Sequence, residues 1–263
     1  MRQAGGRRSR VHRSGSLLAF VLLVVGCAIP SPRITPSPGT PSPETTSNLA
    51  HVQPEDVLLP GAEGLALHGT WRSADGGAGL AVLLLPMYGG RRQDWDSIAE
   101  SLQQAGFASL AIDLRGQGDT GGTEDWTLAV DDVAAAQDWL AARPEVDPQQ
   151  RGTVGASIGA NLALAHAARY PDVRAVALLS PGLDYFRVSI ERLMDPYGDR
   201  SILLVASEKD GYSAETVQTL ADQAEGRAEL VVYPGGAHGT ELFFTQTSLI
   251  DTLVDFLRSS LER

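Results

Sequence analysis

Short apolar runs alternate with longer segments of helical periodicity from about residue 51 to the C-terminus. Six of these runs are continuous rather than alternating in polarity: 80–85, 108–112, 152–155, 173–179, 202–206 and 230–233. A strand that is buried on both faces has this pattern, as in a parallel sheet covered by helices. Two earlier and weaker runs, 57–59 and 65–71, are expected to form an antiparallel edge.

Segments with the periodicity of helices lie between the runs. They cover residues 95–102, 128–142, 157–170, 214–224 and 248–261. Two of them end just before a proline, at 144 and 171, because the residue before proline avoids the helical region. Alternating strands and helices predict a doubly wound α/β sheet in one domain over residues 51–263.

Residues 1–26 have the pattern of an export signal. Five arginines precede an apolar stretch at 17–26, which is shorter than the roughly 20 residues that span a bilayer. Gly26 and Cys27 resemble the end of a bacterial lipobox, which predicts cleavage before Cys27 and lipidation of this cysteine. An ordinary signal peptide and an uncleaved anchor are the alternatives.

Residues 27–50 are rich in Pro, Ser and Thr and have no apolar period. We expect them to form an extended tether between the lipid and the domain. The protein is therefore expected to be exported and held at the membrane through Cys27, on the outer face of the cytoplasmic membrane or in the periplasm.

The chain carries a formal net charge of -11 at pH 7. A nucleic-acid-binding protein carries a basic surface that displaces counterions from phosphates, so we expect no nucleic-acid partner. The sequence contains no cluster with metal-ligand spacing, and we expect neither a metal nor a cofactor.

A nucleophile turn is predicted at Gly155-Ala156-Ser157-Ile158-Gly159, which fits the pattern G-x-S-x-G. A serine at a sharp turn from strand to helix needs small neighbours, because a β-carbon two residues away would clash. The run at 152–155 precedes the serine and a segment of helical periodicity follows it. The alternative is a glycine-rich turn in which Ser157 only caps the helix.

In four further motifs the chain resembles the α/β-hydrolase superfamily from about residue 51 to its end. The motifs stand in the family's order: Pro86-Met87-Tyr88-Gly89-Gly90, Asp113-Leu114-Arg115-Gly116-Gln117-Gly118-Asp119, Ser207-Glu208-Lys209-Asp210 and Gly235-Gly236-Ala237-His238-Gly239. The resemblance implies a mostly parallel eight-stranded sheet flanked by helices and a catalytic triad headed by Ser157. It also implies an oxyanion hole made by the backbone N–H groups of Ile158 and Tyr88, with Met87 as the alternative to Tyr88. We expect Asp113 and Arg115 to brace their turn.

Only one of the five histidines is placed to act as a base for Ser157. His238 lies on a loop after a late strand, among small residues, whereas His166 lies about 13 Å along the helix that starts at Ser157. The acid that orients the imidazole is predicted to be Asp210, since the order serine, aspartate, histidine is that of the family. Glu208 and Asp184 are the alternatives.

The segment between the strands ending at 179 and starting at 202 is too short for a large lid. It holds one short helix at most, so we expect a minimal lid and an open pocket. Its candidate wall residues are Met87, Tyr88, Trp95, Tyr185, Phe186, Tyr212 and Phe243.

The predicted activity is hydrolysis of carboxylic esters, with a small acyl compound as substrate and an acyl-enzyme on Ser157. The minimal lid resembles that of dienelactone-hydrolase-like members, which typically carry a cysteine nucleophile. A thioesterase, an aminopeptidase-like amidase, an acyl transferase and a non-catalytic binding lipoprotein of the same fold are the alternatives.

Overall fold

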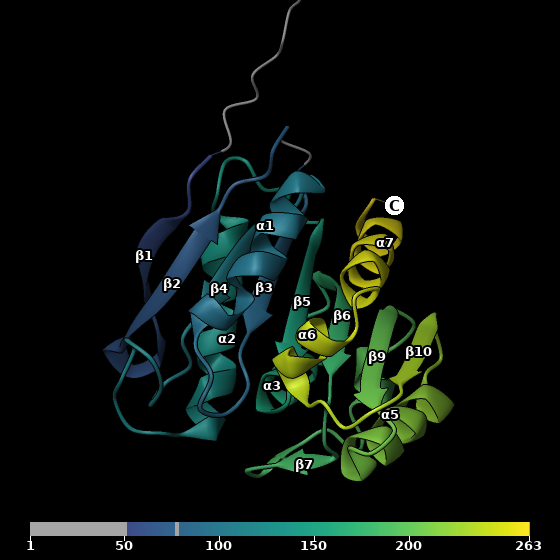
Figure 1. Cartoon of the computed structure of the whole chain (residues 1–263). Helices are drawn as coiled ribbons and strands as arrows, with labels where there is room; N and C mark the ends of the chain where they lie inside the picture. Colours follow the sequence, from purple (N-terminus) through teal and green to yellow (C-terminus); the bar gives the residue numbers. More distant parts are fainter. Residues whose placement is uncertain (1–51, 77–78, 263) are drawn as a thin grey trace, which may run out of the picture. The chain divides into compact units, whose positions relative to one another are not determined.

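Eight strands form one mixed sheet in the computed structural model, which describes residues 52–76 and 79–262 (Figure 1). They are β1 (Glu55–Pro60), β2 (Ala66–Arg72), β3 (Ala81–Leu85), β4 (Ala108–Ile112), β5 (Arg151–Ala156), β6 (Val173–Leu179), β9 (Ser201–Ser207) and β10 (Ala228–Tyr233). The order across the sheet is β1-β2-β4-β3-β5-β6-β9-β10. The β1–β2 and β2–β4 pairs are antiparallel and the other pairs are parallel. The predicted mostly parallel eight-stranded sheet and its antiparallel edge are confirmed.

Helices cover both faces of the sheet. The face with α2 (Trp126–Ala141), α3 (Ile158–Ala167) and α5 (Gly211–Gln223) holds one core, and the face with α1 (Asp96–Gln104) and α7 (Leu249–Leu261) holds the other. The helix α5 starts three residues earlier than the sequence predicted. Successive side chains of a strand point to opposite faces. In β3, Leu83 and Leu85 therefore enter the first core, while Val82 and Leu84 enter the second.

The segment between β6 and β9 holds one short helix, as expected, and also a hairpin that was not predicted. It contains a two-stranded hairpin, β7 (Asp184–Tyr185) and β8 (Val188–Ser189), and a single helical turn, α4 (Met194–Tyr197). Strands of two residues carry no periodic signal, so the sequence pattern did not indicate the hairpin.

Shorter elements complete the order. They are η1 (Ala62–Gly64), η2 (Arg92–Trp95), η3 (Gly239–Glu241) and α6 (Leu242–Thr245). Within the described residues, no helix is both long and apolar enough to cross a membrane. The predicted signal, the tether and Cys27 lie outside the described residues.

The loops that follow β3, β5, β9 and β10 leave the carboxyl ends of parallel strands. These ends meet at one edge of the sheet, where ligands bind in open α/β sheets. The fold therefore brings together the four loops that carry the predicted site residues.

Candidate active site

Ser157 stands at a sharp turn between β5 and α3. Its φ is 53° and its ψ is -119°, a combination that residues other than glycine rarely adopt. A β-carbon on Gly155 would lie 2.2 Å from the carbonyl oxygen of Gly159. One on Gly159 would lie 2.5 Å from the carbonyl oxygen of Leu85. Both flanking glycines are therefore required by the turn.

His238 and Asp210 form a side-chain pair at the carboxyl ends of β9 and β10. The distance between His238 Nδ1 and Asp210 Oδ2 is 2.7 Å. Asp210 directly precedes α5, and its side chain makes no capping hydrogen bond to that helix. Its carboxylate is thus directed to the imidazole, where it can hold the ring orientation and stabilise a charged imidazole.

The two alternative acids lie elsewhere. Glu208 is exposed, and no contact between it and His238 is present in the described part of the chain. Asp184 accepts a hydrogen bond of 2.9 Å from the backbone N–H of Arg187 inside the hairpin turn. Only Asp210 of these three carboxylates contacts the imidazole in the described residues.

The histidine loop packs against the serine turn. A β-carbon on Gly239, whose φ is 58°, would lie 3.5 Å from Ala156 Cβ, so the residue after His238 packs on the residue before Ser157. The Tyr185 ring lies 6.4 Å from the His238 ring, and its hydroxyl is hydrogen-bonded to the side chain of Ser213 at 3.3 Å. Burial raises the pKa of the Tyr185 hydroxyl, and the hydrogen bond to Ser213 opposes the effect.

Two serines whose role the sequence did not predict hold the histidine loop. Ser180, fully buried at the end of β6, accepts a hydrogen bond of 3.0 Å from the N–H of Gly239. Ser207, at the end of β9, donates one of 2.8 Å to the carbonyl oxygen of Ala237. Both serines directly follow or end predicted strands, which is the only signal in the sequence for this role.

The loop after β3 presents free N–H groups. Gly90 donates its N–H to the Met87 carbonyl at 3.0 Å, and Gly89 donates to Gln117 Oε1 at 3.0 Å. The N–H groups of Met87, Tyr88 and Ile158 have no acceptor among residues 52–76 and 79–262. Ile158 is also the first residue of α3, where the helix dipole favours negative charge. These N–H groups can donate hydrogen bonds to a developing oxyanion.

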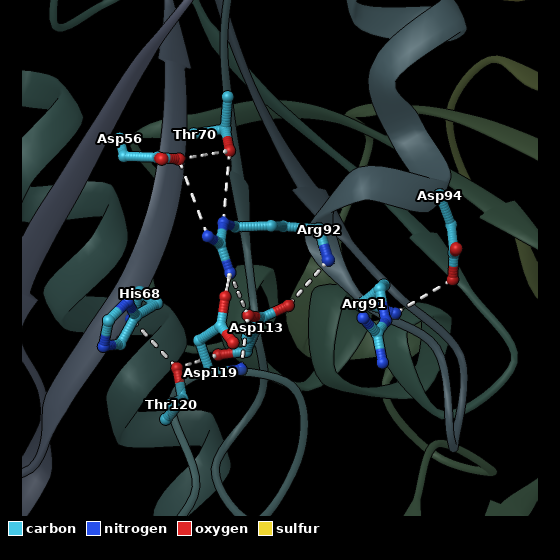
Figure 2. Close-up of polar contacts among 9 residues, drawn as sticks. All are labelled: Asp56, His68, Thr70, Arg91, Arg92, Asp94, Asp113, Asp119 and Thr120. Carbon is cyan, nitrogen blue, oxygen red and sulfur yellow. Dashed lines mark hydrogen bonds and ion pairs between the residues drawn. The ribbon is translucent and has the colours of Figure 1, made fainter.

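A buried charge network fixes the start of η2, directly after this loop (Figure 2). The Asp113 carboxylate accepts the backbone N–H of Arg92 at 2.7 Å and also pairs with the Arg92 guanidinium. The guanidinium reaches Asp119 at 2.7 Å. Burial opposes the charge on Arg92, but the bonds to Asp119 and Asp113 outweigh burial and raise the pKa of Arg92. The same guanidinium lowers the pKa of Asp119.

The two charged residues of the D-x-R turn make structural contacts. A β-carbon on Gly118 would lie 2.3 Å from the carboxyl carbon of Asp113, so the turn wraps closely around that carboxylate. Arg115 forms a two-point pair with Asp132 of α2, at 2.6 and 2.8 Å. The hydrogen bonds to Asp132 raise the pKa of Arg115. Sequence reasoning missed Arg92 and Asp132, whose roles depend on contacts distant in sequence.

The predicted pocket residues divide into two groups. Tyr185 lies near His238, the Tyr212 ring lies 5.7 Å from the Tyr185 ring, and Met87 lies against Gly239. Trp95 does not join them. Its side chain is fully buried in the second core, 6.0 Å from the Phe243 ring, so it offers no surface to a substrate. Residues 52–76 and 79–262 contain no group of three or more His, Cys, Asp or Glu that could hold a metal ion.

Known proteins with a similar chain support this architecture. An uncharacterized protein of Mycobacterium tuberculosis is 28% identical over 244 residues, which cover 84% of each chain. The solved dienelactone hydrolase from Anabaena variabilis is 25% identical with a TM-score of 0.67, covering 80% of this chain and 98% of that chain. An esterase from Pyrococcus furiosus is 20% identical with a TM-score of 0.69, covering 85% of this chain and 95% of that chain.

A family model described as the alpha/beta hydrolase fold matches residues 81–202. This stretch includes the loop after β3 and the Ser157 turn. It ends before Asp210 and His238, which the structure brings into contact at the same edge of the sheet. The sheet order, the turn and the matched segment agree, and the chain has the α/β-hydrolase fold.

Proposed function

We propose that the protein is a serine hydrolase that cleaves carboxylic esters through an acyl-enzyme on Ser157. The observation that carries the proposal is the 2.7 Å contact between His238 Nδ1 and Asp210 Oδ2 beside the strained Ser157 turn. A serine hydroxyl is a weak nucleophile unless a base stands next to it. The oriented imidazole supplies that base.

The reaction proceeds in two halves. Ser157 Oγ attacks the ester carbonyl carbon while His238 takes the hydroxyl proton, and the carbonyl oxygen becomes an oxyanion. The N–H groups of Ile158 and of Tyr88, with Met87 as the alternative, hold this oxyanion. The imidazolium gives the proton to the leaving alkoxide, and an alcohol departs. Water then attacks the acyl-enzyme by the same steps and releases the acid and free Ser157.

The similar proteins support hydrolysis as the reaction class, since one is named an esterase and another a dienelactone hydrolase. Thioester or amide hydrolysis, and acyl transfer to an acceptor alcohol, use the same groups. They remain alternatives, as does a binding lipoprotein without activity.

A fluorophosphonate probe tests the nucleophile. We expect labelling and p-nitrophenyl acetate hydrolysis in the wild type, and loss of both in Ser157→Ala and His238→Ala. Ser97→Ala is the control, because Ser97 is an exposed serine on α1. Labelling that survives Ser157→Ala contradicts the proposal, and inertness of the wild type towards probe and esters favours a binding protein.

We also propose that the protein is exported and lipidated on Cys27, on the sequence pattern alone. The test is metabolic labelling with an alkyne fatty acid in a bacterial host, comparing the wild type with Cys27→Ala. We expect label and membrane association only in the wild type. A soluble, unlabelled wild-type protein contradicts the proposed lipidation and does not affect the proposed enzymatic activity.

A further inference from the structure

The β7–β8 hairpin turns through two residues in an unfavourable backbone conformation. Phe186 has a φ of 52° and Arg187 a φ of 68°, the region that hairpin turns normally fill with Gly, Asn or Asp. Backbone strain of this kind persists where surrounding contacts impose it, and it is concentrated at functional sites. The hairpin therefore holds a large aromatic side chain at a position that local preference disfavours.

A buried amide fixes the hairpin to the nucleophile helix. Asn161, four residues after Ser157 and fully buried, donates hydrogen bonds to the carbonyl oxygens of Gly182 at 2.7 Å and Val188 at 2.8 Å. Its side-chain oxygen accepts the N–H of Gly182 at 3.2 Å. The position of the hairpin is thus set by the helix that carries the nucleophile turn.

Phe186 completes a cluster of three aromatic rings beside the oxyanion loop. Its ring stacks on Trp126 at 5.1 Å and lies 5.1 Å from Tyr88. The Tyr88 and Trp126 rings are 6.1 Å apart. Phe186 and Tyr88 are nevertheless about half exposed. Large exposed apolar surface next to a reaction centre is typical of a substrate-binding surface.

A cavity of about 160 Å³ opens behind this cluster. Trp126, Val130, Ala165, Phe186, Val188 and Leu193 give it apolar walls, and Thr127, Arg169, Arg187 and Ser189 give it polar ones. A volume of about 150 Å³ is large enough for a benzene molecule, and the apolar walls provide a surface on which a ring can pack. Ala165 lies eight residues beyond Ser157, about 12 Å along the helix axis. A substrate group bound in the cavity would therefore be connected to the reacting carbonyl by a short linker in the substrate.

The cavity and His238 lie on different sides of the hairpin. Tyr185 contacts His238, whereas the next residue, Phe186, contacts Trp126 and lines the cavity. The leaving group departs next to the histidine that protonates it. The acyl group is therefore the part of an ester that can extend towards the cavity.

We propose that this cavity binds the apolar end of the acyl group, an aromatic ring or a short alkyl chain on a linker, and that Phe186 determines this specificity. The proposal rests on the proposed ester hydrolysis at Ser157. It assigns the substrates to medium-length or aryl-alkyl esters rather than acetates.

The kinetic test compares p-nitrophenyl 4-phenylbutyrate with p-nitrophenyl acetate. Thr127→Trp places a large ring in the cavity from an exposed position on α2. We expect it to lower the ratio of the two kcat/KM values at least tenfold, and Phe186→Ala to lower it as well. Gln218→Trp adds the same ring on the exposed side of α5 and should leave the ratio unchanged. A ratio that Thr127→Trp does not change overturns the proposal.

A binding test separates this proposal from the hydrolysis. Isothermal titration of Ser157→Ala with 4-phenylbutanol should show saturable binding, which is lost when Thr127→Trp is added and kept when Gln218→Trp is added. If no ester is cleaved by the wild type, the proposed function fails and the titration still decides on the cavity. Absence of saturable binding, or binding that Thr127→Trp does not affect, overturns the cavity assignment.

Discussion

Gly89 donates its backbone N–H to Gln117 Oε1 at 3.0 Å, and this bond joins the loop after β3 to the turn after β4. Gln117 is buried, and its Nε2 has no partner within the described residues. Gln117 belongs to the turn after β4, and the ion pair between Arg92 and Asp113 also holds this turn in place. Gln117 is therefore a positioning residue for the loop that presents the Tyr88 N–H.

Replacing Gln117 with methionine keeps the length of the side chain and removes the acceptor. We expect kcat to fall roughly tenfold, because losing one hydrogen bond of about 1–1.5 kcal/mol displaces the oxyanion donors. KM should change little, since the loop acts on the transition state. The measurement is steady-state kinetics on p-nitrophenyl butyrate. Gln93→Met, at an exposed glutamine in η2, serves as the matched control, and an equal loss in both variants contradicts the assignment.

The second prediction concerns the acid. Asp210→Asn should keep the fold and lower kcat/KM by about 10³- to 10⁴-fold, because an amide does not stabilise the charged imidazole or its working tautomer. Glu208→Gln and Asp184→Asn should each stay within about threefold of the wild type, since neither carboxylate contacts His238. A larger loss in Asp184→Asn than in Asp210→Asn would reassign the acid.

Arg92 is predicted to be a stabilising residue. Arg92→Met leaves the fully buried Asp113 carboxylate without its charged partner, which should cost about 3 kcal/mol of unfolding free energy. Urea denaturation followed by circular dichroism gives the difference. Arg91→Met, at the adjacent exposed arginine, should change the midpoint little, and similar midpoints for the two variants would refute a stabilising network.

His166 should make the stability depend on pH. Burial lowers its pKa to about 4 from an ordinary 6.5, and its Nδ1 has no hydrogen-bond partner in the described part of the chain. The unfolded chain therefore binds more protons than the folded one between about pH 4 and 6.5, so stability falls as the pH decreases through this window. Above about pH 6.5 the imidazole is neutral in both states, so His166 no longer makes the unfolding free energy depend on pH.

The measurement is the unfolding free energy at pH 8 and pH 4.5 for the wild type and His166→Gln. The decrease from pH 8 to pH 4.5 should be smaller in the variant by roughly 2–3 kcal/mol. Carboxylates that titrate in the same window contribute equally to both proteins and cancel in the difference. Parallel profiles for the two proteins would show that His166 does not titrate as its burial requires.

The sequence was sufficient for the parts of the molecule that local pattern determines. Continuous aliphatic runs predicted the buried strands, and Gly155 and Gly159 predicted the turn around Ser157, since their need for small side chains is visible in five residues. Trp95 follows the same pattern, although we also expected it to line the pocket, and that expectation is wrong. Its spacing with Ile98, Ala99 and Leu102 already indicated a core-facing helix side, and the structure buries all four.

Long-range contacts explain what the sequence did not indicate. Gln117 binds a loop 28 residues away, and Asn161 binds a hairpin 21 and 27 residues away. The periodicity of apolar residues along the sequence does not indicate such distant partners. The hairpin itself has strands of two residues, and its φ values at Phe186 and Arg187 oppose the turn preferences on which a sequence prediction depends.

The missing side chain of Gly239 has a mechanical consequence. A β-carbon there would lie 3.0 Å from the Met87 sulfur and 3.5 Å from Ala156, so the histidine loop, the loop after β3 and the end of β5 contact one another without space between them. In the proposed reaction, proton transfer and oxyanion binding are consequently not separately adjustable. A displacement of the proposed base would displace the proposed oxyanion donors with it, and selection at any of the three segments would act on all of them.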